Sequence, residues 1–334
     1  MSFALESAAL ESALAKTIAR FGEIPGLTVE QNVRLANHTR FGIGGPAAVF
    51  VCVAGIPGFL TALQVAKDSG LSFAIVGAGS NLVVADEGFA GIVLKLTANS
   101  LSTNGTDVDV DAGAVLQDLV DFTVDCGLAG VHSMAGIPGF TGAAIYGNAG
   151  AYGHSMHEVV KTVRIFDGAA ILEFNNAECE FEYRGSIFKK HKNWTILSAR
   201  LTLRPDDAAK LREEADKILA VRNKKYPPTM KCAGSIFKNY LLKNLPANVA
   251  EQVPAGVVIE GKVPSAWFLE QVGAKGMSEG DIHVADYHAN LIYNGGNGTA
   301  REIRRIIDEL KRRVGERWGI PLEEEVQYIG FANG

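Results

Sequence analysis

The sequence predicts an α+β fold in two parts, and three observations lead to this prediction. The chain has 334 residues, which exceeds the ~100–200 residues of one ordinary domain. From Ala47 to about Leu203, short runs of β-branched residues alternate with helical patterns. Beyond a charged segment that ends in Tyr226-Pro227-Pro228, the chain is rich in loops and carries one long helical pattern.

The N-terminal part begins with a helix, which we expect over residues 4–21 because Leu10, Leu14, Ile18 and Phe21 recur at helical spacing. Two short helices should follow near residues 58–69 and 115–126. The expected strands are Val49–Val53, Phe73–Val76, Ile92–Leu96, Val108–Val110, Val163–Phe166 and Ile196–Leu203.

The C-terminal part is separated by a charged helix, which Pro205-Asp206-Asp207 starts and which runs to about Lys225. The later elements are a helix near Ala266–Val272, a strand near Ala289–Tyr293, a helix over Thr299–Trp318 and a last strand, Val326–Ile329. We assign residues 1–36 to an N-terminal helical extension, residues 37–204 to a first domain and residues 205–334 to a second.

Composition and charge exclude several classes of function. With 37 acidic and 32 basic side chains the net charge is −5, and no dense basic block is present, so neither nucleic acid nor an anionic membrane is an expected partner. No apolar run approaches the ~20 residues that cross a bilayer, and the amino terminus lacks the pattern of a secretory signal. We therefore expect a cytoplasmic protein.

The cysteines and histidines do not form a metal motif. Cys52, Cys126, Cys179 and Cys232 are far apart in the sequence, so we expect buried, reduced thiols rather than a zinc or thiol-exchange site. The seven histidines have no ligand spacing, and neither a His-Glu-x-x-His motif nor a nucleophile elbow is present. Metalloenzyme and hydrolase functions are disfavoured, and no metal is expected.

Two glycine-rich segments are candidate cofactor loops. The first is Gly77-Ala78-Gly79-Ser80-Asn81-Leu82, which follows an apolar strand and could wrap a phosphate with its backbone N–H groups. Leu82 stands where a dinucleotide fingerprint of the Rossmann type needs a third glycine, so a Rossmann unit is disfavoured. The second segment runs from Gly136 to Gly153 and holds either a pair of tight turns or a surface on which the backbone approaches a large ligand. Its candidate contact residues are Gly136, Ile137, Pro138, Gly139, Gly142, Asn148, Ala149 and Gly150.

Three further residues could take part in chemistry, although each is ordinary by itself. Arg184 could clamp a substrate carboxylate at two points, and Ser235 lies among small residues that would leave space for a ligand. Glu325 ends an acidic run before an apolar strand. Each residue also has a structural explanation, as a surface arginine, a turn serine and a solvated edge.

Together the segments resemble the UDP-N-acetylenolpyruvoylglucosamine reductases (UDP-N-acetylmuramate dehydrogenases), the flavoenzymes that make the muramic acid precursor of bacterial peptidoglycan. The resemblance runs from Asn37 to Gly330 and is carried by segments in the family's order. These are Asn37–Pro46, Gly77–Leu82, Gly136–Gly139, Asn148–Gly153, Tyr183–Ser186, Ala233–Asn239 and Glu325-Val326.

The resemblance implies a two-part FAD-binding region of the vanillyl-alcohol oxidase and p-cresol methylhydroxylase (PCMH) type, followed by a smaller α+β substrate-binding domain. It implies non-covalent FAD, held by the two glycine-rich segments, and NADPH as hydride donor. The implied substrate is a small molecule, UDP-N-acetylglucosamine enolpyruvate, and the implied state is a monomer. Ser235 would deliver a proton to the substrate, and Arg184 and Glu325 would bind and stabilise the intermediate. Lys225 and Asn239 match positions that contact the sugar nucleotide.

Some residues depart from the family pattern, and two other functions stay open. Ala143 and Ile236 replace a glycine and an aromatic residue that are common there, and residues 241–262 form an insertion. The 51 positions between Arg184 and Ser235 resemble the family branch without an extra tyrosine-bearing loop. The alternatives are an FAD-dependent alcohol oxidase of the same fold and a non-catalytic protein that binds flavin or a nucleotide sugar.

Overall fold

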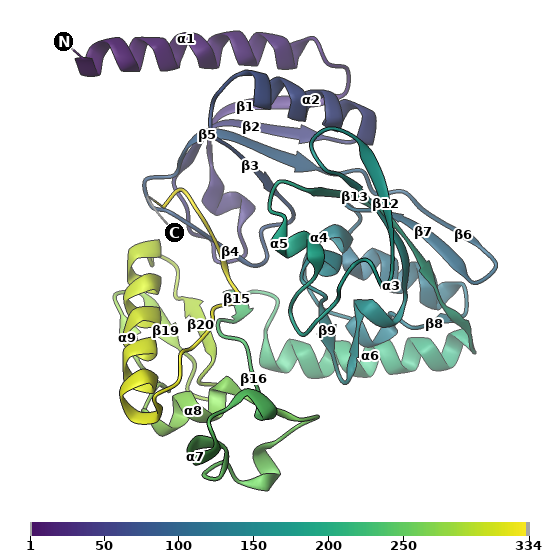
Figure 1. Ribbon diagram of the computed structural model, residues 1–334, viewed down its shortest axis with the longest axis vertical. Coiled ribbons are helices and arrows are strands. Elements are labelled where there is room, and N and C mark those ends of the chain that lie inside the picture. Colours follow the sequence, from purple (N-terminus) through teal and green to yellow (C-terminus); the bar gives the residue numbers. More distant parts are fainter. Residues whose placement is uncertain (1, 332–334) are drawn as a thin grey trace. The chain divides into compact units, whose positions relative to one another are not determined.

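The computed structural model describes residues 2–331, with side chains from residue 11 onward. Residue 1 of the predicted N-terminal extension and residues 332–334 of the predicted second domain lie outside this description. So does the side chain of Leu10, which the predicted first helix includes. The chain forms two compact units (Figure 1). The first unit comprises the residues up to Val33, Ala47–Ala78 and Ala90–Pro227, and the second comprises Arg34–Pro46, Gly79–Phe89 and the described residues from Pro228 onward.

A four-stranded sheet forms one part of the first unit. Its strands, in spatial order, are β1 (Leu27–Arg34), β2 (Pro46–Val53), β5 (Phe89–Leu96) and β3 (Phe73–Val76). Strands β3 and β5 are parallel, with Phe73 opposite Ile92. Helix α1 (Ser2–Gly22) packs against α2 (Ile56–Asp68), and Arg20 pairs with Asp68 at 2.9 Å.

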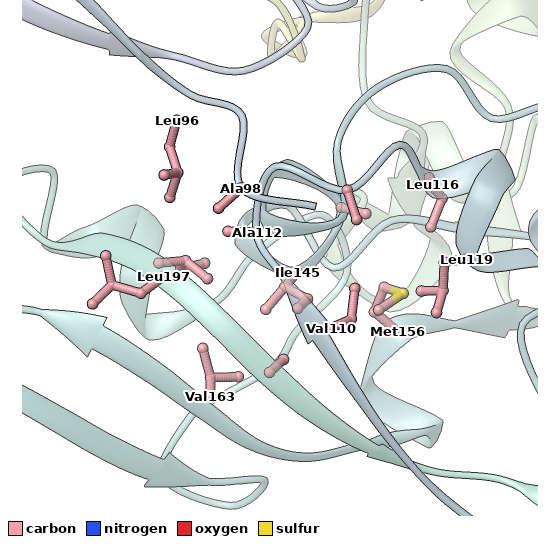
Figure 2. Close-up of a cluster of buried hydrophobic side chains, with 14 of the residues drawn as sticks. Leu96, Ala98, Val110, Ala112, Leu116, Leu119, Ile145, Met156, Val163 and Leu197 are labelled. Carbon is pink, nitrogen blue, oxygen red and sulfur yellow. The ribbon is translucent and has the colours of Figure 1, made fainter. Parts of the chain in front are cut away.

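A five-stranded antiparallel sheet forms the other part of the first unit. Its strands, in spatial order, are β12 (Ile171–Asn175), β11 (Val160–Phe166), β13 (Thr195–Thr202), β7 (Asp107–Asp111) and β6 (Leu101–Asn104). The helices of this part are α3 (Leu116–Asp125), α4 (Thr141–Tyr146), α5 (Ile187–Lys190) and α6 (Ala208–Lys225). Figure 2 shows side chains of the sheet, such as Val110, Val163 and Leu197, gathered with Leu116, Leu119 and Ile145 of the helices in one buried apolar cluster.

Short elements complete the first unit. They are the strand pairs β8 (Leu128–Ala129) with β14 (Arg204–Pro205) and β9 (Gly150–Ala151) with β10 (His154–Ser155), and the 3₁₀ helices His132–Met134 and Met156–Glu158. The β9–β10 pair is closed by Tyr152 and Gly153, whose φ angles are 53° and 83°. Two consecutive positive φ angles are typical of the tightest hairpin turn.

The second unit has its own core, built on an antiparallel sheet and the long helix α9 (Ala300–Trp318). The sheet strands, in spatial order, are β15 (Lys231–Ser235), β20 (Leu291–Asn294), β19 (Ile282–Val284) and β18 (Ser278–Glu279). The other elements are β4 (Leu82–Val84) with its parallel partner β21 (Gln327–Ile329), β16 (Tyr240–Leu241) with β17 (Lys262–Val263), helices α7 (Ala247–Ala250) and α8 (Ser265–Gln271), and 3₁₀ helices Leu35–His38, Leu242–Asn244 and Ala255–Val257.

Every predicted strand corresponds to a strand of the structure, and the long predicted helices are α1, α6 and α9. Strands β1, β6, β12, β15 and β19 were not predicted, and neither were the two-residue strands β8, β9, β10, β14, β16, β17 and β18. The sequence analysis also treated as loop the stretch that forms α4. The predicted insertion at 241–262 is a closed excursion, because β16 and β17 pair at its two ends.

The division into units differs from the predicted boundaries at 36/37 and 204/205. Helix α6 belongs to the first unit, because Leu211 and Ala215 are buried in its core and Arg212 pairs with Asp121 of α3 at 2.5 Å. The second unit also takes in Arg34–Pro46 and Gly79–Phe89, which lie far earlier in the chain.

The prediction that all four cysteines are buried was wrong at two positions. All four are free thiols, but Cys126 at the end of α3 is exposed and Cys52 is half-buried. Cys179 and Cys232 are buried, and burial raises the pKa of the Cys179 thiol to about 12, so this thiol stays protonated at neutral pH.

Candidate active site

Arg184 lies at the tip of a tight turn, residues 182–185, which we call the arginine turn. The backbones of Glu182 and Gly185 exchange two hydrogen bonds of 3.1 Å across it. Arg184 has a φ angle of 55°, a left-handed conformation that glycine adopts far more readily than arginine. Such conformations persist where the surroundings enforce them, and they gather at functional sites.

The arginine turn is held by the second glycine-rich segment. The side-chain amide of Asn148 donates to the carbonyl oxygen of Glu182 at 3.0 Å, and the hydroxyl of Ser186 donates to the carbonyl oxygen of Tyr146 at 2.7 Å. Ser186 is fully buried and Asn148 is 6% exposed. The guanidinium of Arg184 also reaches the carbonyl oxygen of Gly150 at 3.4 Å. The fold therefore joins a predicted catalytic residue to predicted cofactor-binding residues within one unit.

Asn148 uses its side-chain amide to bind the backbone of the protein at two places. Its Oδ1 accepts from the backbone N–H of His157 at 3.0 Å while its Nδ2 holds the arginine turn. Its φ angle of 43° is one that asparagine tolerates better than most residues. Both ends of the side-chain amide thus fix the backbone around the turn.

Close packing requires glycine at some positions of the two predicted cofactor loops but not at others. A Cβ atom on Gly142 would lie 2.7 Å from the Cβ of Ala112, and one on Gly150 would lie 2.4 Å from the carbonyl oxygen of His154, so close packing requires both glycines. A Cβ atom on Gly77 would meet Phe140 and Ala143 only at ordinary distances of 3.7 Å and beyond. Packing against the protein therefore does not explain Gly77, and the lack of a side chain there would let a ligand approach the backbone closely.

A cavity of about 300 Å³ lies against the start of the second glycine-rich segment. Its apolar walls are Val115, Ile137, Pro138, Ala215 and Leu219, with Gly136 beside them. Four polar or charged side chains complete the lining: Gln117 and Asp121 of α3, and Arg212 and Asp216 of α6. The backbone N–H of Gly136 donates to the side-chain oxygen of Gln117 at 2.8 Å, which fixes the loop at the cavity edge. The cavity thus combines apolar side chains with four polar or charged ones at the edge of the second glycine-rich segment.

The end of the first glycine-rich loop belongs to the second unit and is held there by close backbone contacts. A Cβ atom on Gly79 would lie only 1.8 Å from the carbonyl oxygen of His38, and the carbonyl oxygen of Gly79 accepts from the N–H of Arg40 at 3.1 Å. Gly79 therefore has to be a glycine for the fold. Ser80 and Asn81 follow it and lead into Leu82 at the start of β4.

Ser235 is placed by an irregularity at the end of β15. This strand pairs with β20 at Lys231 and Cys232, shifts register, and pairs again at Ser235 opposite Leu291. Gly234, within the shift, has a φ angle of 77°. A bulge of this kind redirects the side chain beside it, and such bulges are common next to active sites.

Glu325 is held on both sides of its backbone. Its N–H donates to the carbonyl oxygen of Ile236 at 2.7 Å, and its carbonyl oxygen accepts from the side-chain amide of Asn81 at 2.7 Å. The carbonyl oxygen of Asn81 in turn accepts from the N–H of Gln327 at 2.9 Å. Residues from three distant segments, Asn81, Ser235 and Glu325, are thus linked through one short stretch of backbone.

One residue of this cluster was missed by the sequence analysis. Asn290 is 2% exposed, and its side-chain amide exchanges two hydrogen bonds with the backbone of Phe237, at 2.9 and 2.8 Å. The only signal in the sequence is an asparagine inside a predicted apolar strand. Such a buried amide must find partners.

The two residues predicted to bind substrate lie in different units. Lys225 is the last residue of α6 in the first unit, and its ammonium lies 5.2 Å from the centre of the Tyr226 ring. Asn239, in the second unit, accepts at Oδ1 from the N–H of Ser265, the first residue of α8, at 3.2 Å. Within the units, the fold gathers Arg184 with Asn148 and Gly150, and Ser235 with Glu325 and Asn81.

Comparisons with known proteins bear on both parts of the chain. Residues 47–171 match the FAD binding domain family, and residues 226–329 match the C-terminal domain of UDP-N-acetylenolpyruvoylglucosamine reductase. Over 311 residues the chain is 56% identical to the UDP-N-acetylenolpyruvoylglucosamine reductase of Solibacter usitatus, which covers 93% of this chain and 100% of that protein. The chain belongs to the UDP-N-acetylenolpyruvoylglucosamine reductase family.

More distant members of the family agree with this assignment. The UDP-N-acetylenolpyruvoylglucosamine reductase of Bacillus subtilis is 33% identical over 302 residues, which is 90% of this chain and 93% of that protein. The crystal structure of UDP-N-acetylenolpyruvylglucosamine reductase from Thermus caldophilus superposes with a TM-score of 0.71 at 26% identity, covering 91% of this chain and 99% of that one.

The family resemblance predicted from the sequence is therefore confirmed. So is the predicted fold class, an α+β protein with an FAD-binding domain followed by the reductase C-terminal domain. The chain is an FAD-dependent oxidoreductase. No helix among residues 2–331 is long and apolar enough to span a membrane. The roles of the individual site residues stay predictions.

Proposed function

We propose that this protein reduces UDP-N-acetylglucosamine enolpyruvate to UDP-N-acetylmuramate, with NADPH as the source of hydride and FAD as the bound cofactor. The observation that carries the proposal is the link between Ser235, Glu325 and Asn81 in the second unit, where 2.7 Å hydrogen bonds tie Glu325 both to Ile236 and to the first glycine-rich loop. Two predicted catalytic residues and one predicted cofactor residue share this link.

FAD is assigned to the two glycine-rich segments, of which Gly136, Ile137 and Pro138 line the cavity of about 300 Å³. When bound, FAD supplies the two-electron hydride chemistry that none of the twenty side chains provides. The remaining work belongs to residues of this chain, which bind the substrate, stabilise charge and deliver a proton.

The three predicted catalytic residues are assigned to stabilise the charge that develops on the substrate and to deliver the proton that completes the reduction. When hydride adds to the methylene carbon of the enolpyruvyl group, the electron pair of the double bond shifts toward the neighbouring carbon and its carboxylate. A guanidinium such as that of Arg184 can bind this carboxylate at two points, and one preorganised donor contributes about 3–4 kcal/mol to such a transition state. The φ angle of 55° at Arg184 supports this assignment, because strained backbone conformations cluster at functional sites.

The proton that completes the reduction is assigned to the hydroxyl of Ser235. An alcohol is a weak acid, so it donates only to a strongly basic carbon that is held close, and a placed donor contributes ~10²–10⁴-fold in rate. The bulge before Ser235 and the two hydrogen bonds to the backbone of Glu325 support this assignment, because they hold the backbone at both residues. Glu325 is assigned to stabilise the same intermediate, and Lys225 and Asn239 to the sugar nucleotide.

The proposal extends to the cellular setting on the basis of the family resemblance. The product is a precursor of peptidoglycan, and the protein acts as a monomer in the cytoplasm on a small-molecule substrate.

The test is a turnover measurement on the purified protein. Its flavin spectrum is recorded, and NADPH consumption is followed with and without the enolpyruvyl substrate. Substrate-dependent consumption of NADPH is the expected result. Oxygen-dependent oxidation of an alcohol would instead indicate an oxidase, and a flavin that neither NADPH nor substrate affects would indicate a binding protein.

A further inference from the structure

We propose that Asn290 is a positioning residue for substrate reduction, which fixes Ser235 and Glu325 through the backbone of residues 236–237. The inference rests on the proposed function. Asn290 immediately precedes β20 and contributes to neither of the glycine-rich loops.

Asn290 binds the backbone beside Ser235 at three points. Its carbonyl oxygen accepts from the N–H of Ile236 at 3.1 Å. Its Oδ1 accepts from the N–H of Phe237 at 2.9 Å, and its Nδ2 donates to the carbonyl oxygen of Phe237 at 2.8 Å. Phe237 is 1% exposed, so these bonds lie away from water, where hydrogen bonds are strongest and their loss costs most.

The side chain of Asn290 binds the backbone just beyond the last paired residues of β15 and β20. Strands β15 and β20 pair for the last time at Ser235 and Leu291, just after the bulge. Of the next two residues, Ile236 donates its N–H to the main-chain carbonyl of Asn290, and Phe237 is bound by the Asn290 side-chain amide. Ser235 thus has a strand partner in Leu291, and the backbone that follows it is fixed at Ile236 by the main chain of Asn290 and at Phe237 by its side chain.

The same stretch of backbone holds Glu325. The carbonyl oxygen of Ile236 accepts from the N–H of Glu325 at 2.7 Å, and the N–H of Lys238 donates to the carbonyl oxygen of Glu323 at 2.9 Å. A shift of residues 236–237 therefore moves both Ser235 and Glu325. Because misplacement by about 1 Å can reduce a rate ~10²-fold, removal of the Asn290 side chain should slow the step that needs both residues.

The chain offers a matched control in Asn294, four residues along at the end of β20. It is also buried, at 5% exposure. Its Nδ2 donates to the carbonyl oxygen of Phe41 at 3.0 Å, and its Oδ1 accepts from the N–H groups of Gly296 and Gly298 at 2.8 and 2.9 Å. Asn294 thus has a similar set of bonds in the same unit but directs them to other backbone.

The experiment compares Asn290→Ala and Asn294→Ala as FAD-loaded enzymes in rapid mixing. Flavin reduction by NADPH is followed first, and reoxidation by the enolpyruvyl substrate second. We expect Asn290→Ala to be reduced at the wild-type rate and reoxidised ~10²-fold more slowly, with kcat lowered more than KM. Asn294→Ala should keep both rates within about threefold of wild type, even if it melts earlier, because its bonds support other backbone.

The inference is overturned if Asn290→Ala is reoxidised as fast as wild type, or if Asn294→Ala loses as much reoxidation rate. Failure of wild type itself to be reoxidised by substrate would instead refute the proposed function. If Asn290→Ala does not fold with FAD, Asn290→Asp takes its place, because it keeps the size and the acceptor for Phe237 but loses the donor. That variant should be reoxidised about tenfold more slowly, and a wild-type rate would contradict the inference.

Discussion

Replacement of Arg184 by glycine should leave the fold more stable than replacement by alanine, while both changes strongly reduce activity. Arg184 has a φ angle of 55° in the arginine turn. For residues other than glycine this left-handed conformation costs roughly 1–2 kcal/mol, whereas glycine adopts it freely and loses about 0.5–1 kcal/mol through its more flexible unfolded chain. The net difference in the free energy of unfolding should be about 0.5–1 kcal/mol in favour of Arg184→Gly.

The comparison of the two variants isolates the backbone. Both lose the guanidinium and all its contacts, including the one to Gly150, so these contacts cancel. Thermal unfolding followed by circular dichroism should place the Tm of Arg184→Gly about 1–4 °C above that of Arg184→Ala. Both variants should lose about 10²–10³-fold in substrate reduction if the guanidinium stabilises developing charge.

A control at a residue with ordinary backbone geometry should give the opposite sign. Lys192 is exposed and lies outside the set of residues with positive φ, so Lys192→Ala should melt above Lys192→Gly. Equal melting temperatures for the two Arg184 variants, or a higher value for alanine, would show that the turn carries no backbone strain.

Three further predictions concern other parts of the chain. Gly79→Ala should destabilise the fold by roughly 3–5 kcal/mol in thermal unfolding, because its Cβ would lie 1.8 Å from the carbonyl oxygen of His38. Gly77→Ala should fold normally, because its Cβ would make only ordinary contacts, and should bind FAD more weakly in a flavin titration. Hydrogen bonds from two arginines of α9 lower the pKa of Glu309 from 4.5 to about 2. The stabilisation is therefore complete above pH 4.5 and is lost as pH falls toward 2, so the Tm difference between wild type and Glu309→Gln should shrink over this range. Asn148→Ala should cost about 1–3 kcal/mol, because it leaves buried backbone groups unpaired, and should raise KM for the substrate by loosening the arginine turn.

Elements with a strong apolar period could be predicted from the sequence. Helix α9 is an example, since Ile303, Ile306, Ile307 and Leu310 are buried at helical spacing and Thr299 caps its start. Strands β1 and β12 were not predicted. Neither has a fully buried residue, and β1 alternates only over residues 27–29 before three exposed residues interrupt the pattern. The spacing of apolar residues in the sequence predicts which face of an element is buried, so a largely exposed element gives only a weak pattern.

The candidate site shows the same limit at the level of single residues. The segments that hold Arg184, Ser235 and Glu325 could be found from motifs, but their geometry depends on partners far along the chain. Asn148 reaches the arginine turn across 34 positions, and Asn290 reaches Phe237 across 53. No local pattern contains such contacts. The placement of α6 in the first unit could not be predicted for a similar reason, because the core on which this helix packs is decided by tertiary contact.

The most direct test of the account is the behaviour of Ser235→Ala in the two half-reactions. In rapid mixing, NADPH should reduce the flavin of this variant as fast as that of wild type, because the serine hydroxyl has no part in that step. Reoxidation by the enolpyruvyl substrate should fall by ~10²–10⁴-fold, since the proton donor is missing. Reoxidation at the wild-type rate would contradict the assignment of Ser235, and with it the proposed chemistry of this site.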